Sequence, residues 1–117
     1  MGNASTTSLI NLKTDRPSTE VALKKLKMEL MTLRRIGVTR VKIIHGYGST
    51  GQGGSIRNAV RAELLEMARD NRIKAFCPGE LFGPFEKPGR HLLEIDAAFR
   101  NDSDWARSND GVTLVSL

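Results

Sequence analysis

Four blocks of apolar residues along the chain have the pattern of short strands. Residues 8–13 (SLINLK) alternate apolar and polar positions, and residues 38–45 (VTRVKIIH) are rich in β-branched side chains. Residues 73–77 (IKAFC) and 111–117 (GVTLVSL) show the same short, apolar pattern. These four blocks are therefore predicted to form the strands of one sheet.

Apolar residues with helical spacing lie between the first three of these blocks. Residues 17–20 (PSTE) supply a capping side chain, a proline and an acid for a first helix, which Gly37 is expected to end. Ser55 is the predicted N-cap of a second helix that runs to about Asn71. The apolar faces of the two helices are predicted to consist of Leu23, Leu26, Leu30 and Leu33 in the first, and Ile56, Val60, Leu64 and Met67 in the second.

This order of elements predicts an α/β fold. We expect a two-layer βαβαββ sandwich, in which a four-stranded mixed sheet carries two helices on one face. The strands at 38–45 and 73–77 are joined through a helix, so they should run parallel with a right-handed crossover.

Residues 78–110 form a connection that is long for a small domain. We treat this segment as an insertion between the last two strands. Its stretch HLLEIDAAF predicts a short helix that docks on the core through Leu92, Ile95 and Phe99. The expected organisation is a flexible tail at 1–7 and a single domain at 8–117.

Composition narrows the class of protein. The chain has 117 residues, enough for one modest core, and its one cysteine, Cys77, favours a reducing compartment and therefore the cytoplasm. No apolar run has the length of a membrane span, so we expect no membrane partner. Lysine and arginine outnumber the acids by 18 to 13, which gives a net charge of +5 and favours polyanions such as DNA or RNA as partners.

A loop with five glycines, HGYGSTGQGGS, joins the second strand to the second helix. Gly46, Gly48 and Gly51 have the spacing of a dinucleotide-binding fingerprint, but the predicted helix begins late and no acid ends the next strand. A nucleotide phosphate loop can also be aligned here, but Gly54 stands where that motif needs its lysine. Neither nucleotide-binding motif explains the loop.

The loop and its flanks resemble the second motif of the Smr domain, the small MutS-related module, which reads HG-x-G followed by a glycine-containing loop and [LI]-R-x-x-V. The matching residues are His45, Gly46 and Gly48, then Ile56, Arg57 and Val60. The closing NDGVTLVSL is similar to the last strand of that family, and the resemblance extends from residue 10 to residue 117. It implies a fold like the C-terminal domain of bacterial translation initiation factor three.

The resemblance also implies a function and a set of partners. Its members are associated with nucleic-acid binding and with nicking or endonucleolytic hydrolysis of phosphodiester bonds. DNA or RNA would then be the partner, within a DNA repair or translation-linked assembly. The oligomeric state is left open.

The sequence departs from the family at the first motif, which is typically L-D-L-H-G. This chain reads INLKT, with Asn11 in place of the acid and Lys13 in place of the histidine. The glycine loop is also longer than usual. Two hypotheses therefore remain open: a nuclease that acts through His45 and Arg57, or a docking module for nucleic acid or protein that does not cut. Lys13 keeps a cation that suits phosphate contact.

The candidate site residues follow from this comparison and from their chemistry. His45 and Arg57 are the candidate catalytic residues, because an imidazole near neutral pH moves protons and a guanidinium binds phosphate oxygens. His45 could instead only bond the loop, and Arg57 could pair with an acid. The candidate phosphate-binding residues are Lys13, Gly46, Tyr47, Gly48, Gly51, Gly53, Gly54, Ser55 and Arg57, in which loop amides and a helix N-terminus form the cradle.

The remaining predictions concern the aromatic residues, His91 and the binding of metals or cofactors. Tyr47 is the candidate for stacking on a base, whereas Trp105 is expected to anchor the insertion. His91 is expected to be structural. The chain lacks metal-site spacing, so no metal or cofactor is expected to be tightly bound, and a need for a divalent cation is left open.

Overall fold

The strands and helices follow the order that the hydrophobic pattern predicts. The computed structural model describes residues 7–15, 17–47 and 53–117. The strands are β1 (Ser8–Asn11), β2 (Arg40–Ile44), β3 (Ala75–Pro78) and β4 (Val112–Ser116). The helices are α1 (Thr19–Arg35), α2 (Gly53–Arg69) and α3 (Lys87–Ile95), with two short 3₁₀ helices, η1 (Gly79–Leu81) and η2 (Ala97–Asn101).

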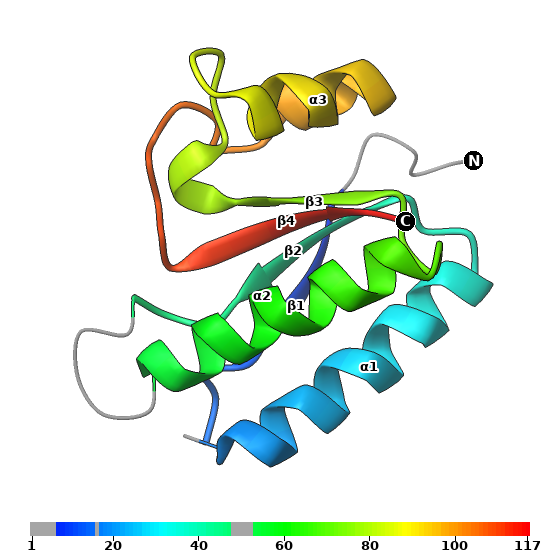
Figure 1. The fold of residues 1–117 in the computed structure, drawn as a ribbon, viewed down its shortest axis with the longest axis vertical. Coiled ribbons are helices and arrows are strands. Elements are labelled where there is room, and N and C mark those ends of the chain that lie inside the picture. Colours follow the sequence, from blue (N-terminus) through cyan, green and yellow to red (C-terminus); the bar gives the residue numbers. More distant parts are fainter. Residues whose placement is uncertain (1–6, 16, 48–52) are drawn as a thin grey trace.

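The four strands form one mixed sheet in the order β1-β2-β4-β3 (Figure 1). β1 and β2 are parallel, and β4 is antiparallel to both β2 and β3. β2 and β3 therefore run in the same direction, as expected, with β4 between them. As a result, β1, β2 and β3 all finish at the end of the sheet where β4 begins. We call this the loop end, because the glycine loop leaves β2 there.

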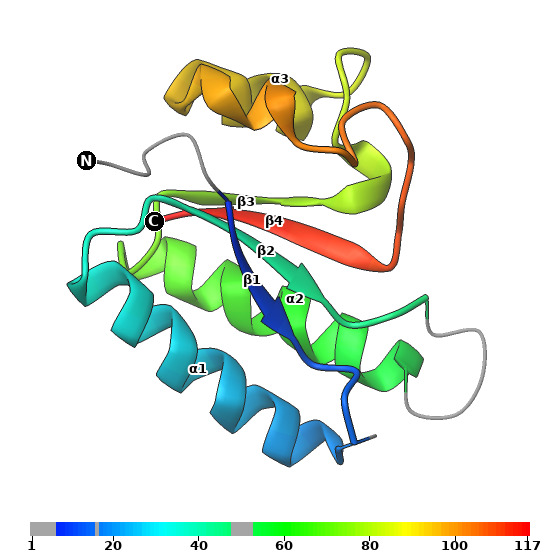
Figure 2. The same cartoon turned by 180° about the vertical axis from the view of Figure 1, so that it is seen from behind.

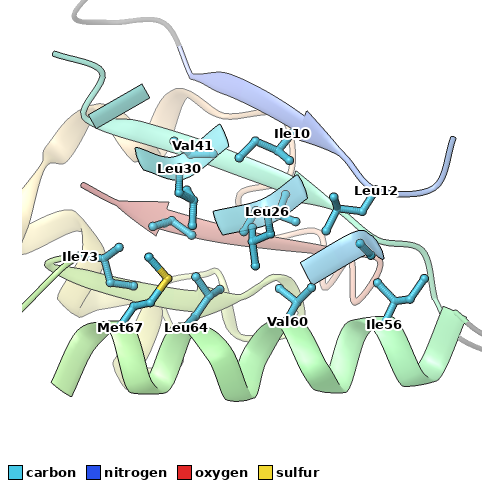
Figure 3. Packing of buried hydrophobic residues seen from close by; sticks show 13 residues of the cluster. Ile10, Leu12, Leu26, Leu30, Val41, Ile56, Val60, Leu64, Met67 and Ile73 are labelled. Atoms are coloured by element: carbon cyan, nitrogen blue, oxygen red, sulfur yellow. The ribbon is translucent and has the colours of Figure 1, made fainter. Parts of the chain in front are cut away.

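One face of the sheet is covered by α1 and α2, which lie side by side (Figures 1 and 2). The Ser18 side chain caps α1 by accepting a hydrogen bond from the Val21 amide, and Gly37 ends it with a φ of +93°. The predicted apolar stripes of both helices point at the sheet (Figure 3). The buried residues of this layer include Ile10, Leu12, Leu26, Leu30, Val41, Ile43, Ile56, Val60, Leu64 and Met67.

The segment between β3 and β4 covers the other face of the sheet with α3, η1 and η2 (Figure 1). Leu92 and Phe99 are buried there, as expected, and Ile95 packs at the margin of the same cluster. The Phe82 ring meets the rings of Phe99 and Trp105 edge to face, at centroid distances of 6.2 and 5.0 Å. Trp105 therefore anchors this segment, and the domain has a layer on each face of its sheet.

Two helix starts differ from the sequence-based prediction. α3 begins at Lys87 rather than near His91, because Pro88 fits the first turn of a helix. α2 begins at Gly53, so Ser55 lies inside its first turn and is not its N-cap. The burial of Ile56 and Val60 against the sheet holds this first turn in place and outweighs the low helix propensity of the two glycines.

Candidate functional site

The topology brings Lys13 and the turn after β2 together at the loop end. β1 and β2 are parallel, and the Leu12 amide extends their pairing by donating to the Ile44 carbonyl at 2.8 Å. Lys13 is exposed, and the stem of its side chain lies against Gly46. Gly46 has a φ of +87°, which favours glycine. The sequence-predicted cation and the glycine turn are therefore neighbours.

The turn after β2 is closed by its own hydrogen bonds. The amides of His45 and Gly46 both donate to the Gly111 carbonyl, at 3.1 and 3.0 Å. The Gly46 amide is therefore bonded to the residue before β4 in this structure, and its contact with a phosphate stays a prediction. Sequence spacing could not reveal this bond, since it depends on β4 lying beside β2.

His45 is buried beneath this turn, with 2% of its surface exposed. Its Nδ1 lies 3.0 Å from the Gly46 carbonyl oxygen, and its Nε2 lies 2.8 Å from the Thr113 hydroxyl. A carbonyl only accepts, so Nδ1 carries the proton and Nε2 accepts from Thr113. The Arg61 Nε donates to the same hydroxyl oxygen at 3.1 Å, which leaves the hydroxyl hydrogen for His45. One neutral tautomer is therefore fixed.

Burial lowers the pKa of His45 to about 4. The bond to the Gly46 carbonyl acts in the opposite direction, and the positive charges of Arg61 and Arg57 lower the pKa further. The expectation that this imidazole titrates near neutral pH is therefore wrong, because the ring is buried. At neutral pH His45 is uncharged, and each of its ring nitrogens takes part in a hydrogen bond.

Arg57 ties the turn to the segment before β4. Its Nη1 donates to the Tyr47 carbonyl at 2.7 Å and lies 3.3 Å from the Asp110 carboxylate. The ion pair that the sequence left open is thus present. The Arg57 side chain stays 23% exposed, and its Nε is buried without a hydrogen-bond partner among the described residues. The Nη1 group of Arg57 therefore supports the turn after β2 by binding the Tyr47 carbonyl.

Tyr47 is held by its backbone while its ring faces solvent. Arg57 binds its carbonyl, and its ring lies over Gly111, where a Cβ atom would come within 3.2 Å of the ring. The residue remains 59% exposed. An aromatic ring with an open face suits stacking on a base, and this role of Tyr47 stays a prediction.

Arg61 and Glu80 are a part of the site that the sequence analysis missed. Arg61 forms a two-point ion pair with Glu80, at 2.8 and 2.9 Å, and also reaches the carbonyls of Asp110 and Val112. Burial raises the pKa of Glu80, but the bonds from Arg61 outweigh it and the pKa is lowered. Arg61 follows Arg57 by one helical turn, so the two side chains lie on the same face of the helix. This spacing is the sequence feature that could have indicated that Arg61 belongs to the site.

The remaining candidates fall into two groups. Gly48 and Gly51 lie outside the described residues. Gly53, Gly54 and Ser55 belong to the first turn of α2, which starts at the loop end (Figure 1). Asn11, which stands where the resembling family has an acid, accepts a hydrogen bond from the Lys13 amide at 2.8 Å. Asn11 therefore shapes the chain after β1.

The described ranges contain neither a metal-binding cluster nor a membrane-spanning helix. No group of three or more histidine, cysteine, aspartate or glutamate side chains there could hold a metal ion. No helix in the same part of the chain is both long and apolar enough to span a membrane. The absence of a tightly bound metal stays a prediction.

Comparison with known proteins shows the fold. The sequence matches no protein-family model and no curated protein. Among solved structures, the chain is similar to the Smr domain of Thermus thermophilus MutS2, with a TM-score of 0.58 and 22% identity. The match covers 95% of this chain and 98% of that one. This chain therefore has the α/β fold of an Smr domain, which confirms the predicted α/β class, with its four-stranded mixed sheet and two helices on one face. The segment between β3 and β4 adds a layer on the other face, which the two-layer prediction did not include.

Proposed function

We propose that this domain belongs to the Smr family and binds DNA or RNA through the loop end of its sheet. The observation that carries the proposal is the placement of Lys13 and Arg57 beside the Gly46–Tyr47 turn, on an Smr-type fold. The net charge of +5 favours approach of a polyanion. The unit proposed to do this is a single domain over residues 8–117.

Each part of the loop end has a role in this proposal. Lys13 and the exposed edge of Arg57 contact phosphate oxygens. The N-terminus of α2 at Gly53 adds the positive end of a helix dipole. Tyr47 stacks on an unpaired base, which binds single strands without strict sequence preference.

The site supports binding better than cleavage. Phosphodiester hydrolysis usually needs a group that moves a proton near neutral pH. His45 is buried and neutral, and Glu80 and Asp110 are paired with arginines. We therefore assign His45 the role of a positioning residue: its ring holds the Gly46 carbonyl and Thr113 together, and so fixes the turn that carries Tyr47.

Removing Lys13 tests the proposal most cleanly, because its side chain is exposed. Lys13→Ala and Arg57→Ala should each weaken binding and reduce the slope of log affinity against log salt by about one. Fluorescence anisotropy with labelled single-stranded DNA, duplex DNA and structured RNA measures both quantities. Arg69→Ala is the matched control, since Arg69 is an exposed cation at the far end of α2.

The outcomes of this titration are distinct. Equal losses in Arg69→Ala and Lys13→Ala would mean diffuse attraction with no site at the loop end, and unchanged binding in all variants would refute the proposal. Incubation of supercoiled DNA and RNA with and without magnesium is expected to leave both intact. Cleavage that disappears in His45→Ala would instead establish a nuclease.

Neutralising Asp110 is expected to tighten binding. Its carboxylate lies 3.3 Å from the Arg57 Nη1 and competes with a phosphate for this cation. Asp110→Asn should raise affinity about two- to fivefold at low salt, the range set by an exposed ion pair, and the gain should shrink as salt rises. Asp70→Asn is the control, because Asp70 forms a similar 3.4 Å pair with Arg72 beyond the other end of α2. Equal gains in both variants would contradict a local competition.

A further inference from the structure

A basic groove lies at the end of the sheet opposite the loop end. It runs between the C-terminal turns of α1 and α2 and the end of β4, with a volume of about 340 Å³. A second hollow of about 460 Å³ adjoins it and shares two of its residues, Arg34 and Leu117. We call the two together the arginine groove. Its lining residues are Leu30, Met31, Arg34, Arg35, Met67, Asn71, Arg72, Ile73, Lys74, Ile95 and Leu117.

The charged side chains of this lining are of one sign. Of the described residues that line the groove, four carry a positive side chain and none carries an acidic side chain. Asp70 pairs with Arg72 at 3.4 Å from outside the lining, and its side chain is well exposed. Arg34 is held in place, because its Nη1 donates to the Arg72 carbonyl at 2.8 Å. The groove therefore presents several cations to an acidic ligand, and one of them, Arg34, is held in place.

Between these cations the groove is apolar. Leu30, Met67 and Ile73 lie at one end of the helical layer (Figure 3). They line the groove from beneath as its floor, each with at most 3% of its surface exposed. Met31 forms its rim with 57% of its surface exposed, and Ile36 is exposed just after α1. Methionine is common at surfaces that accept varied apolar side chains, because it is flexible and polarizable. The leucine stripe of α1, by contrast, faces the core.

We propose that the arginine groove binds a short acidic segment of a partner protein. An aliphatic side chain of that segment occupies the apolar floor, and carboxylates on either side contact Arg34, Arg35 and Arg72. The lining, as far as the structure describes the chain, includes no aromatic ring on which a nucleic-acid base could stack. Charge and apolar floor together therefore favour a peptide over a nucleic acid. This proposal is independent of nucleic-acid binding at the loop end.

The test is a titration of the full-length chain, labelled with nitrogen-15, by nuclear magnetic resonance. The first probe is a short peptide of alternating leucine and glutamate. A second replaces leucine by serine at the same charge, a third replaces glutamate by lysine, and a fourth is an oligothymidine. The first peptide should shift the amide signals of the groove residues in a saturable way. The serine peptide should bind at least about tenfold more weakly, because it cannot fill the apolar floor.

Two variants at exposed positions connect the binding to the groove. Met31→Ser and Arg35→Glu should each lower the affinity for the first peptide about tenfold or more, with unchanged thermal unfolding. Arg69→Glu makes the same change of charge on α2 outside the lining and should leave the affinity within about twofold. The proposal is overturned if the groove signals do not shift, if the serine peptide binds equally, if Arg69→Glu matches Arg35→Glu, or if oligothymidine binds there with equal affinity.

Discussion

Lowering the pH from 6.5 to 4 is expected to destabilise the domain by about 3 kcal/mol through His45 alone. The pKa of His45 is about 4 in the folded chain, because burial disfavours the charged ring, and 6.5 is the value of an unburied histidine. Between these values the unfolded chain binds a proton that the folded chain does not. Stability due to His45 is therefore complete above pH 6.5 and falls progressively as the pH drops to 4.

The window between pH 6.5 and pH 4.5 isolates this effect. Glu80 and Asp104 have pKa values below their ordinary 4.5 and 3.8, because arginine and lysine partners outweigh burial, so their contributions are lost only at lower pH. Urea unfolding at several pH values measures the slope. His45→Gln should remove most of it, because this variant has no imidazole to protonate in either state.

The same experiment separates two roles of His45. A positioning residue keeps its buried neutral ring, and its imidazole signals in nuclear magnetic resonance should titrate near pH 4. An imidazole that moves protons in catalysis would titrate near neutral pH. A midpoint near 6.5 would therefore contradict both the burial of His45 and its proposed positioning role.

Parts of the loop end could be predicted from the sequence because they depend on neighbours along the chain. The HG-x-G pattern indicated a glycine turn after a strand, and Gly46 has the positive φ that such a turn uses. The neighbouring positions of Lys13 and Gly46 follow from parallel pairing of β1 with β2. The link from His45 through Thr113 to Arg61 could not be predicted, because it needs β4 inserted between β2 and β3. No local pattern specifies this strand order.

Strand β2 gives a second example of contacts that the local sequence pattern could not predict. Val41 and Ile43 lie on the face of the sheet that packs against the helices. The opposite positions, Arg40 and Lys42, have the pattern of a solvated face, yet both are buried because the segment after β3 covers that face. Their partners are acids more than fifty residues later, Asp96 for Arg40 and the pair Asp102 and Asp104 for Lys42. Charge pairing at such separation is invisible in local periodicity.

Replacing Lys42 by methionine is expected to destabilise the domain by about 3–5 kcal/mol, the cost of breaking a buried ion pair by removing one partner. The Lys42 Nζ lies 2.8 Å from Asp102 and 2.6 Å from Asp104, and its side chain is only 10% exposed. Burial lowers the pKa of Lys42, but the two carboxylates raise it and the net shift is upward. Stability from the lysine is therefore complete at neutral pH and is lost only as the pH rises beyond 10.5.

Two further variants show whether that loss comes from the uncompensated carboxylates. Lys42→Met combined with Asp102→Asn and Asp104→Asn should recover much of the stability, since it leaves no unpaired negative charge beneath the covering segment. Lys74→Met removes an exposed lysine and should change the free energy of unfolding by less than about 0.5 kcal/mol. If urea unfolding finds Lys42→Met as stable as Lys74→Met, then solvent reaches Asp102 and Asp104, and the segment between β3 and β4 does not seal this face of the sheet.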